Sequence, residues 1–549
     1  MRAKLRAPAG LGAVVFLVLI GLFLAAPLAM LGLRSLTDDD GAFTLAHYAA
    51  YIGAPGLRSA ILGTVEIGLG VCLVVLPAAL AYAYALERSR LPFKGVWSAV
   101  ASVPLLAPSL LPALALVYLF GRQGLLTPWL GGWTIYGPQG ILIADAVAAF
   151  PHAVIILRTA LGAADGRLQE QARLLGAGPW RRFWRLTLPN ARHGLISAAF
   201  VVFALTAADV GAPKVVGGDF NVLALDIYKK VIGQQDFQTG AVIAIFLLVP
   251  SLLAIGFERW AAARQSAMAS TRATVFVAAP GPVRDAALTA LCGVVGLIVV
   301  GLLLVCQFAA LVRQWPYDLR LSLAQYDLDK VDGGGWAAVI DSVGLALTVA
   351  AIGAPVAFLG AYVLERGRAA GWLRGAGGLF TLAPAATPGL ALGLAYILFF
   401  DEPANPLFFL YGTPLLLGLA TFTHFYTVAH LTSVSALKAV DRDIEPAAAL
   451  LGRGEVTVLA RVIMPICAPA MLEIAVYLFI NVMTTVSVAL FLSPPDFSLA
   501  AVAVLNMDDA GDEAPAAAMG MLIVYVNLLA RVSGSVAFKM ISSPKLHKT

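Results

Sequence analysis

Long apolar stretches dominate the chain and are separated by short polar loops. A bilayer core of about 30 Å requires on the order of 20 apolar residues in one helix. Stretches of that length predict about twelve membrane-spanning helices and therefore an all-α polytopic membrane protein. The predicted spans are 11–33, 58–86, 95–120, 140–162, 193–212, 239–258, 285–312, 338–364, 376–400, 412–437, 469–493 and 515–538.

The composition agrees with this pattern. The 549 residues are 60% hydrophobic and 13% charged, whereas soluble domains are about 25% charged, so soluble, disordered, collagen-like and coiled-coil proteins are excluded. The net charge of +5 does not indicate nucleic-acid binding, because the basic residues form short clusters between the apolar runs. Most of these clusters fall in alternate loops, which predicts that both termini are cytoplasmic and that the lipid bilayer is the main partner.

An internal repeat divides the chain into two similar halves. Tyr84–Arg88 reads YALER and Tyr362–Arg366 reads YVLER, and the pair Ala107–Pro108 recurs as Ala383–Pro384. We expect Pro104, Pro108 and Pro112 to kink the span 95–120, as Pro384 and Pro388 kink the span 376–400. Each predicted half holds six helices, an even number, so the two halves form a parallel repeat. We expect a first domain over 1–258, a cytoplasmic linker over 259–284 and a second domain over 285–549.

One loop in each half, at about 163–192 and about 438–468, carries the same spacing of glycine and proline. Gly176 precedes Pro189 by 13 residues, and Gly452 precedes Pro465 by 13 residues. The residues before Gly176 favour a helix, the glycine permits a left-handed turn, and the proline is suited to begin the next helix. A single copy would also fit an amphipathic linker on the membrane surface, but two copies at matched positions argue against that alternative.

On these residues the sequence resembles the permease of a binding-protein-dependent ABC importer, over nearly the whole chain. The loop signature of that family is Glu-Ala-Ala, three residues, Gly and, about a dozen residues later, Leu-Pro. The resemblance implies the type I permease fold, a bacterial inner membrane location, two cytoplasmic ABC ATPase subunits and a periplasmic substrate-binding protein as partners. It also implies that each loop is a coupling helix that docks on an ATPase.

The resemblance assigns roles to individual loop residues. Glu170 would pair with a basic residue of the ATPase, Ala172 would pack against it, and Gly176 would make the turn. The second copy departs from the signature, because Glu445 precedes Gly452 by seven residues instead of six and Pro446 takes the position of the carboxylate. The expected contact residues are Glu170, Ala172, Gly176, Ala177, Leu188 and Pro189 in the first loop, and Glu445, Ala448, Gly452 and Pro465 in the second.

The chain contains no sequence that would bind ATP. No Gly-rich run ends in Gly-Lys-Ser/Thr, and neither a zinc-binding pattern nor a nucleophile motif occurs. We therefore expect a transport subunit that is not an enzyme, with no catalytic residues, no metal and no cofactor of its own, and with ATP and Mg bound by the partner ATPase.

Charged residues inside predicted helices are candidates for the translocation pathway, because such residues are costly in a membrane. They are Glu66, Asp145, Asp209 and Lys214, the last two within a Gly- and Pro-interrupted stretch. The corresponding region of the second half, Thr484–Val488, has no charges. An alternative is that Asp209 and Lys214 form an ion pair near the membrane surface, without a substrate role. Likewise, Glu66 and Asp145 could each be a solvated or internally paired carboxylate near the outer mouth of the pathway.

The cargo is the least determined property. Residues 208–228 look most like 2-aminoethylphosphonate permeases, and Lys214, Lys229 or Lys230 would then bind the anionic group. The alternatives are a ferric iron, thiamine or polyamine importer permease. A secondary transporter driven by an ion gradient and a membrane enzyme are further possibilities, and dependence of uptake on a proton gradient would favour the former.

Overall fold

A computed structural model describes residues 7–38, 40–163, 166–268, 276, 278, 280–331, 333–367, 371–494 and 496–541. Asp39 and parts of the predicted linker 259–284 lie outside these residues. The described chain is almost entirely helical, which confirms the predicted fold class. A two-stranded antiparallel hairpin is the exception, with β1 (Val312–Gln314) paired to β2 (Asp318–Leu321).

All twelve predicted spans coincide with helices. Eight helices are long and apolar enough to cross a membrane, and two bent pairs raise that number to as many as ten among the described residues. The other two spans, 239–258 and 412–437, are helical as well. In the second of these, polar residues such as His424 and His430 reduce the mean hydropathy.

Prolines break the two bent spans, as the sequence predicts. Lys94–Leu106 meets Leu110–Phe120 at 95°, and Gly371–Ala386 meets Gly389–Phe400 at 110°. Pro108 and Pro388 stand in the breaks, and the residues before them have extended backbone. A proline disfavours helical geometry in the residue that precedes it, so each apolar stretch forms two helices.

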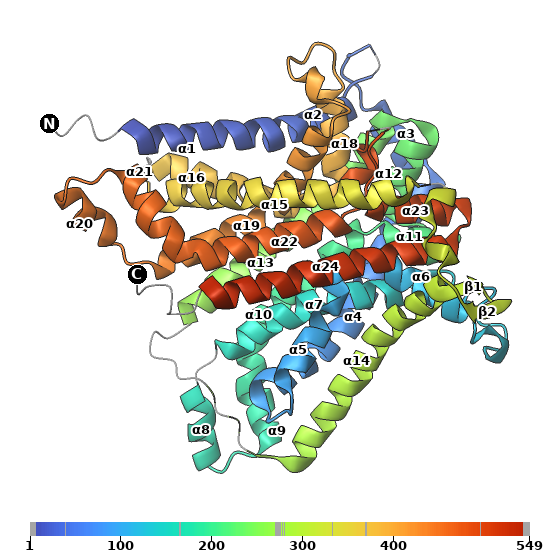
Figure 1. Cartoon of the computed structure of the whole chain (residues 1–549), viewed down its shortest axis with the longest axis horizontal. Coiled ribbons are helices and arrows are strands. Elements are labelled where there is room, and N and C mark those ends of the chain that lie inside the picture. Colours follow the sequence, from blue (N-terminus) through green and yellow to red (C-terminus); the bar gives the residue numbers. More distant parts are fainter. Residues whose placement is uncertain are drawn as a thin grey trace. The chain divides into compact units, whose positions relative to one another are not determined.

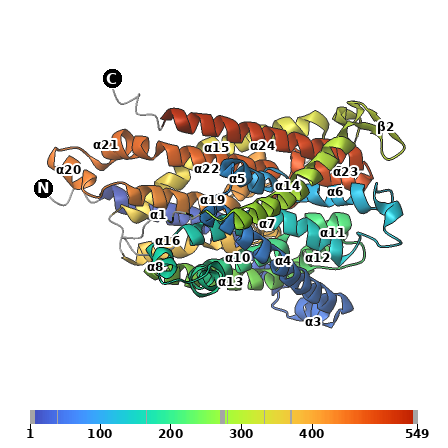
Figure 2. The ribbon, with the colours of Figure 1, turned by 90° about the horizontal axis from the view of Figure 1, so that it is seen from below.

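The chain forms two compact units. One comprises Asp38–Asp332 and Val504–Met521. In it α4, α7, α10 and α13 pack together as a bundle, and α14 lies along α4, α5 and α6 (Figures 1 and 2). Its helices are α3 (Ala46–Gly53), α4 (Pro55–Arg88), α5 (Lys94–Ser102), α6 (Leu110–Phe120), α7 (Pro138–Gly162), α8 (Gly166–Leu174), α9 (Pro179–Arg182), α10 (Leu188–Ala208), α11 (Gly211–Val216), α12 (Leu223–Tyr228), α13 (Phe237–Met268) and α14 (Pro282–Leu311).

The other unit comprises Met1–Thr37, Gly333–Ala503 and Leu522–Thr549. In it α15 packs on α19 and α22, while α1 contacts α15 and α16, and α2 contacts α18 (Figure 1). Its helices are α1 (Ala7–Ile20), α2 (Ala26–Ser35), α15 (Gly335–Glu365), α16 (Gly371–Phe380), α17 (Ala383–Ala386), α18 (Gly389–Phe400), α19 (Pro414–Ala439), α20 (Ile444–Leu450), α21 (Glu455–Val458) and α22 (Met464–Thr484). The residues of α23 (Ala500–Ala510) and α24 (Glu513–Ile541) are divided between the units.

The two units therefore exchange the first helix of each sequence half. Residues 1–37 belong with the second half, and residues 282–332 belong with the first. The domain limits expected from the repeat, 1–258 and 285–549, follow the duplication in sequence, whereas the compact units cross it.

Short turns complete the secondary structure. Two five-residue π turns lead into α10 and α22 at equivalent positions, so the structural repeat of the two halves includes these turns. The π turns are η1 (Gly21–Ala25), η4 (Phe183–Thr187), η5 (Lys229–Gly233) and η9 (Leu459–Ile463); the 3₁₀ turns are η2 (Val103–Leu106), η3 (Thr127–Trp129), η6 (Ala324–Tyr326), η7 (Leu328–Lys330), η8 (Phe408–Leu410) and η10 (Ala489–Phe491).

Candidate functional site

The first coupling loop (163–192) folds as a short helix, a tight turn and a second short helix. Gly176 follows α8 with φ +76°, and its N–H donates to the Arg173 carbonyl at 3.0 Å. The N–H of Ala177 donates to the carbonyl of Ala172 at 2.9 Å, which completes the paired hydrogen bonds of a Schellman helix end. A Cβ at Gly176 would meet no atom within 4 Å, so the backbone angle alone favours glycine here.

The second coupling loop (438–468) repeats this geometry. Gly452 follows α20 with φ +70°, and its N–H donates to Ala449 at 3.1 Å. The N–H of Arg453 donates to Ala448 at 2.9 Å. Each loop ends in a helix whose second residue is proline, Pro189 in α10 and Pro465 in α22; Leu188 is the first residue of α10.

Both loops expose a pair of leucines at the end of the first short helix. Leu174 and Leu175 are 87% and 86% exposed, and Leu450 and Leu451 are 90% and 79% exposed. Adjacent apolar side chains that are this exposed at matched positions are typical of a surface that another protein covers.

The alanines that precede these leucines, Ala172 on α8 and Ala448 on α20, are both half-buried. Ala448 packs against a buried cluster that includes Phe358 and Leu437.

The two loops also differ in the position of their carboxylates. Glu170 is exposed on α8. Glu445 instead turns toward its own half, where the Arg366 guanidinium donates to both of its carboxylate oxygens at 3.0 Å. Arg366 also donates to the carbonyls of Leu437 and Val440 at the end of α19. The Glu445 side chain is therefore already engaged within its own half, and its expected contact with an ATPase stays a prediction.

In the first half an uncharged residue takes the place of Glu445. Gln169 stands seven residues before Gly176, is buried, and donates to the Thr187 hydroxyl at 3.1 Å. Arg88, the repeat equivalent of Arg366, donates to the Leu161 carbonyl at 2.5 Å and lies 4.5 Å from the centre of the Phe276 ring. In both halves the arginine donates to a carbonyl at the end of the following long helix, Leu161 of α7 or Leu437 of α19, and in the second half Arg366 also pairs with Glu445.

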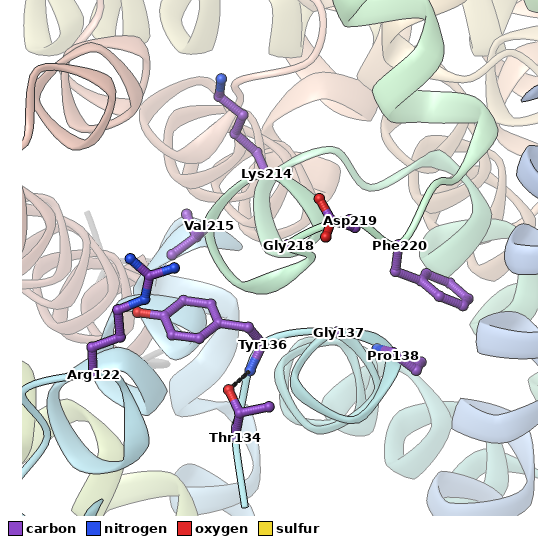
Figure 3. A pocket seen from close by; sticks show the side chains of 10 residues that line it. All are labelled: Arg122, Thr134, Tyr136, Gly137, Pro138, Lys214, Val215, Gly218, Asp219 and Phe220. Atoms are coloured by element: carbon purple, nitrogen blue, oxygen red, sulfur yellow. Dashed lines mark hydrogen bonds between the residues drawn. The ribbon is translucent and has the colours of Figure 1, made fainter.

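A cavity of about 810 Å³ lies at the opposite end of α7 from the first coupling loop. The 25 residues of α7 separate the two places by about 37 Å. Figure 3 shows Arg122 beside the ring of Tyr136, and Lys214 and Asp219 on the segment that follows α10. The lining residues are Arg122, Thr134, Tyr136, Gly137, Pro138, Lys214, Val215, Gly218, Asp219 and Phe220.

Lys214 is engaged by acidic and aromatic groups from other elements. Its ammonium lies 2.9 Å from the Asp509 carboxylate of α23 and 4.7 Å from the centre of the Tyr228 ring. The Tyr228 hydroxyl donates to Asp509 at 3.0 Å. The predicted alternative that Lys214 pairs with Asp209 is therefore wrong.

Asp209 pairs instead with Asp145, which is 3% exposed on α7. Each of these carboxyl groups lies within interaction distance of the other in a buried site, where two carboxylates this close repel. Asp209 also accepts hydrogen bonds from the Ser109 hydroxyl and from the Ala212 N–H, the latter at 2.8 Å. The pair joins α7 to the point where α10 ends and α11 begins.

The structure thus brings together two of the four predicted pathway residues. Asp145 and Asp209 meet, Lys214 lies in the cavity, and Glu66 is exposed on α4 without a contact to the other three. The sequence did not indicate Arg122 or the partner Asp509. The signal that could have identified Arg366 is its place in the repeated Leu-Glu-Arg, which marks the same helix end in both halves.

Comparison with known proteins agrees with this geometry. The family model described as "Binding-protein-dependent transport system inner membrane component" matches residues 75–267 and 353–536, once in each half. A ferric transport system permease protein of Actinobacillus pleuropneumoniae is 25% identical over 445 residues, which are 77% of this chain and 63% of that protein. One described as a putative ferric transport system permease protein, of Haemophilus influenzae, is 25% identical over 419 residues, 72% of this chain and 64% of that protein.

A third relative matches a shorter region. A molybdenum transport system permease protein of Escherichia coli is 32% identical over 157 residues, 28% of this chain and 69% of that protein. The chain spans a little under two thirds of the length of the two ferric relatives. The family match nevertheless covers more than half of the chain and falls on the two repeats that contain the coupling loops. The chain therefore belongs to the family of inner membrane components of binding-protein-dependent transport systems.

Proposed function

We propose that the chain is the permease subunit of an ATP-driven importer and that its cargo is ferric iron delivered by a periplasmic binding protein. The observation that carries the choice of cargo is the extent of the ferric relatives, which match 77% and 72% of the chain and so extend through both halves. Molybdenum and sulfate permeases match 28% to 38% of it.

Both acidic and basic groups stand at the cavity, since Arg122 and Lys214 line it as well, and the carboxylates are the groups suited to a cationic cargo. Asp508, Asp509 and Glu513 belong to the same unit as the cavity, and Asp219 lines it. Carboxylate oxygens are suited to hard cations. Lys214, which an anionic phosphonate would need, already pairs with Asp509, and Lys230 contacts Gln234 at 2.8 Å. None of the relatives named above is a phosphonate permease, so ferric iron replaces the aminoethylphosphonate favoured by the sequence.

The proposed energy source is a pair of ATPase subunits docked on the coupling loops. The exposed leucine pairs give each loop an apolar contact surface, and α7 and α10 connect the first loop to the cavity region. In this proposal ATP and Mg are bound by the ATPase, both termini are cytoplasmic, and ATP-driven closure of the ATPases moves the helices that flank the cavity.

Reconstitution tests the proposal. The full chain, its ATPase and a binding protein loaded with ⁵⁵Fe(III) are combined in proteoliposomes, and accumulated iron is counted. Uptake should require all three proteins and ATP, and should persist when the proton gradient is collapsed. Molybdate, sulfate and 2-aminoethylphosphonate, each loaded on its own binding protein, are tested as alternative cargoes. Uptake without ATP, or uptake of one of these compounds but not of iron, would contradict the proposal.

A further inference from the structure

We propose that the two coupling loops bind their ATPase subunits by different contacts: the first through Glu170 and a net positive surface together with Leu174 and Leu175, the second mainly through Leu450 and Leu451 on a loop with no net charge. This inference rests on the proposed function, because it takes the ATPase as the partner. It assigns the cause of the difference to Arg366, which holds Glu445 inside its own half.

The carboxylates of the two loops stand at different positions relative to the turn glycine. Counting back from the turn glycines, Glu170 stands six residues before Gly176 and Pro446 stands six before Gly452. Glu445 is one residue further from the glycine and therefore points about 100° away around the helix. It faces the interior, as its counterpart Gln169 does in the first half.

Burial makes the inward position of Glu445 stable. The side chain of Arg366 is 6% exposed and that of Glu445 is 22% exposed. Rotation of Glu445 toward a partner would leave the guanidinium without its carboxylate in a nearly buried site, which is unfavourable. A contact between Glu445 and the ATPase would first have to compensate for the stabilisation lost with that ion pair, so Glu445 stays with Arg366.

The net charges of the loops differ in the same sense. Residues 163–192 contain six arginines and two acidic residues, a net charge of +4. Residues 438–468 contain four basic and four acidic residues, a net charge of 0. On the first loop Glu170, Arg173, Arg181 and Arg185 are exposed. A partner surface that carries carboxylates as well as an apolar groove therefore fits the first loop better than the second.

The leucine pairs are what the loops share. Leu174–Leu175 and Leu450–Leu451 occupy the same two positions before the turn, and all four side chains are exposed. The apolar contact is thus available to both ATPase subunits, whereas the net positive charge and the exposed carboxylate six residues before the turn glycine belong to the first loop. Salt screens exposed charges but not apolar contacts. The salt dependence of the ATPase affinity therefore distinguishes the two loops.

The test uses the full chain in nanodiscs and the purified ATPase subunit. Leu450→Ala with Leu451→Ala leaves the first loop as the main docking site, and Leu174→Ala with Leu175→Ala leaves the second. The dissociation constant is measured at 50 mM and at 500 mM NaCl. Affinity for the first loop should fall by about fivefold at high salt, and affinity for the second should change by less than about twofold.

Substitution of the carboxylates sharpens the test. At low salt Glu170→Gln should weaken first-loop binding by about fivefold, whereas Glu445→Gln should change second-loop binding by less than about twofold. Glu445→Gln should instead increase hydrogen exchange in α20 by about tenfold or more, because the helix loses its ion pair. Glu455→Gln, in the same loop but outside that pair, is the matched control and should alter neither.

A variant of the second loop that carries the carboxylate arrangement of the first loop provides the converse test. Pro446→Glu combined with Glu445→Gln places a carboxylate at the position of Glu170 and a neutral residue at the position of Gln169. This variant should tighten second-loop binding at low salt and make it depend on salt. Equal salt dependence of the two wild-type loops, or equal losses from Glu170→Gln and Glu445→Gln, would overturn this inference alone. A chain that bound no ATPase at either salt would overturn the proposed function as well.

Discussion

The two halves of the chain build the same helices and place different polar groups on them. Pro138 and Pro414 begin α7 and α19, 276 positions apart, and the same offset relates the starts of α10 and α22. At that offset the paired acids Asp145 and Asp209 of the first half correspond to Thr421 and Thr485 of the second. The first half therefore has a charged contact where the second has hydroxyl groups.

At the coupling loops the distribution of charged contacts between the halves is reversed. There the second half has the buried ion pair, Arg366 with Glu445, and the first half has the neutral Gln169. Features that depend on backbone geometry, such as the proline breaks and the glycine turns, are the same in both halves. Features that depend on side-chain chemistry have diverged, so one fold supports two non-equivalent halves.

The largest predicted difference concerns the two arginines. Arg366→Gln should lower the free energy of unfolding by about 3 kcal/mol, because it leaves the Glu445 carboxylate without its buried partner. Arg88→Gln should cost about 1–2 kcal/mol, because it removes the hydrogen bond to the Leu161 carbonyl and the contact with the Phe276 ring. Denaturant unfolding of the nanodisc-embedded chain measures both values.

The double variant Arg366→Gln with Glu445→Gln is the control for this pair. It removes the stranded carboxylate and should recover part of the loss. Equal destabilisation by Arg366→Gln and Arg88→Gln would show that the ion pair adds nothing to the helix-end hydrogen bonds that both arginines make.

The acid pair gives the next effect. Asp209→Ala should cost about 2 kcal/mol, because the N–H of Ala212 and the Asp145 carboxyl lose their partner in a buried site. Asp145→Asn should cost less than about 1 kcal/mol, since the amide keeps the shape of the carboxyl group, can donate to Asp209 and removes a like charge. Thr421→Ala, at the equivalent of Asp145, should be comparably mild, because its hydroxyl bonds only within its own helix. Thermal unfolding of the three variants tests this order, and a larger loss for Asp145→Asn than for Asp209→Ala would reverse the assigned roles.

The sequence predicted the duplication and the helices of each half, because an apolar stretch of sufficient length has few alternatives in a membrane. It also predicted the breaks near Pro108 and Pro388, where local geometry decides. It did not predict that the first helix of each half packs with the other half, since an apolar surface does not specify its neighbour. Lys214 with Asp509 and Arg366 with Glu445 were missed for a related reason: each pair forms only when distant segments fold together.

The acidic residues of α23 predict a smaller, pH-dependent effect. Burial and the neighbouring charges of Glu513 and Asp509 raise the pKa of Asp508 to about 6, and Lys214 opposes part of that shift. An aspartic acid whose pKa is raised in the folded state stabilises the fold below its unfolded pKa, and this stability is lost as the pH rises through about 6. The chain should therefore be about 1 kcal/mol less stable at pH 7.5 than at pH 5 from this group.

Asp508→Asn is the matched variant, because it keeps the shape and removes the titration. Unfolding measured at both pH values should show a smaller difference for the variant than for the wild type. An unchanged difference would place the titrating group elsewhere.

The smallest predicted effect is the one that the two halves share. Gly176→Ala and Gly452→Ala should each cost about 1 kcal/mol, because an alanine at positive φ is strained. The losses should be equal, since φ is +76° and +70° and neither position has an atom within 4 Å of an added Cβ. Gly178→Ala and Gly454→Ala, at negative φ and equally open, are controls that should be neutral or slightly stabilising. Hydrogen exchange of α8 and α20 measures the local loss, and a clear inequality between Gly176→Ala and Gly452→Ala would mean that the difference between the halves extends to the turns themselves.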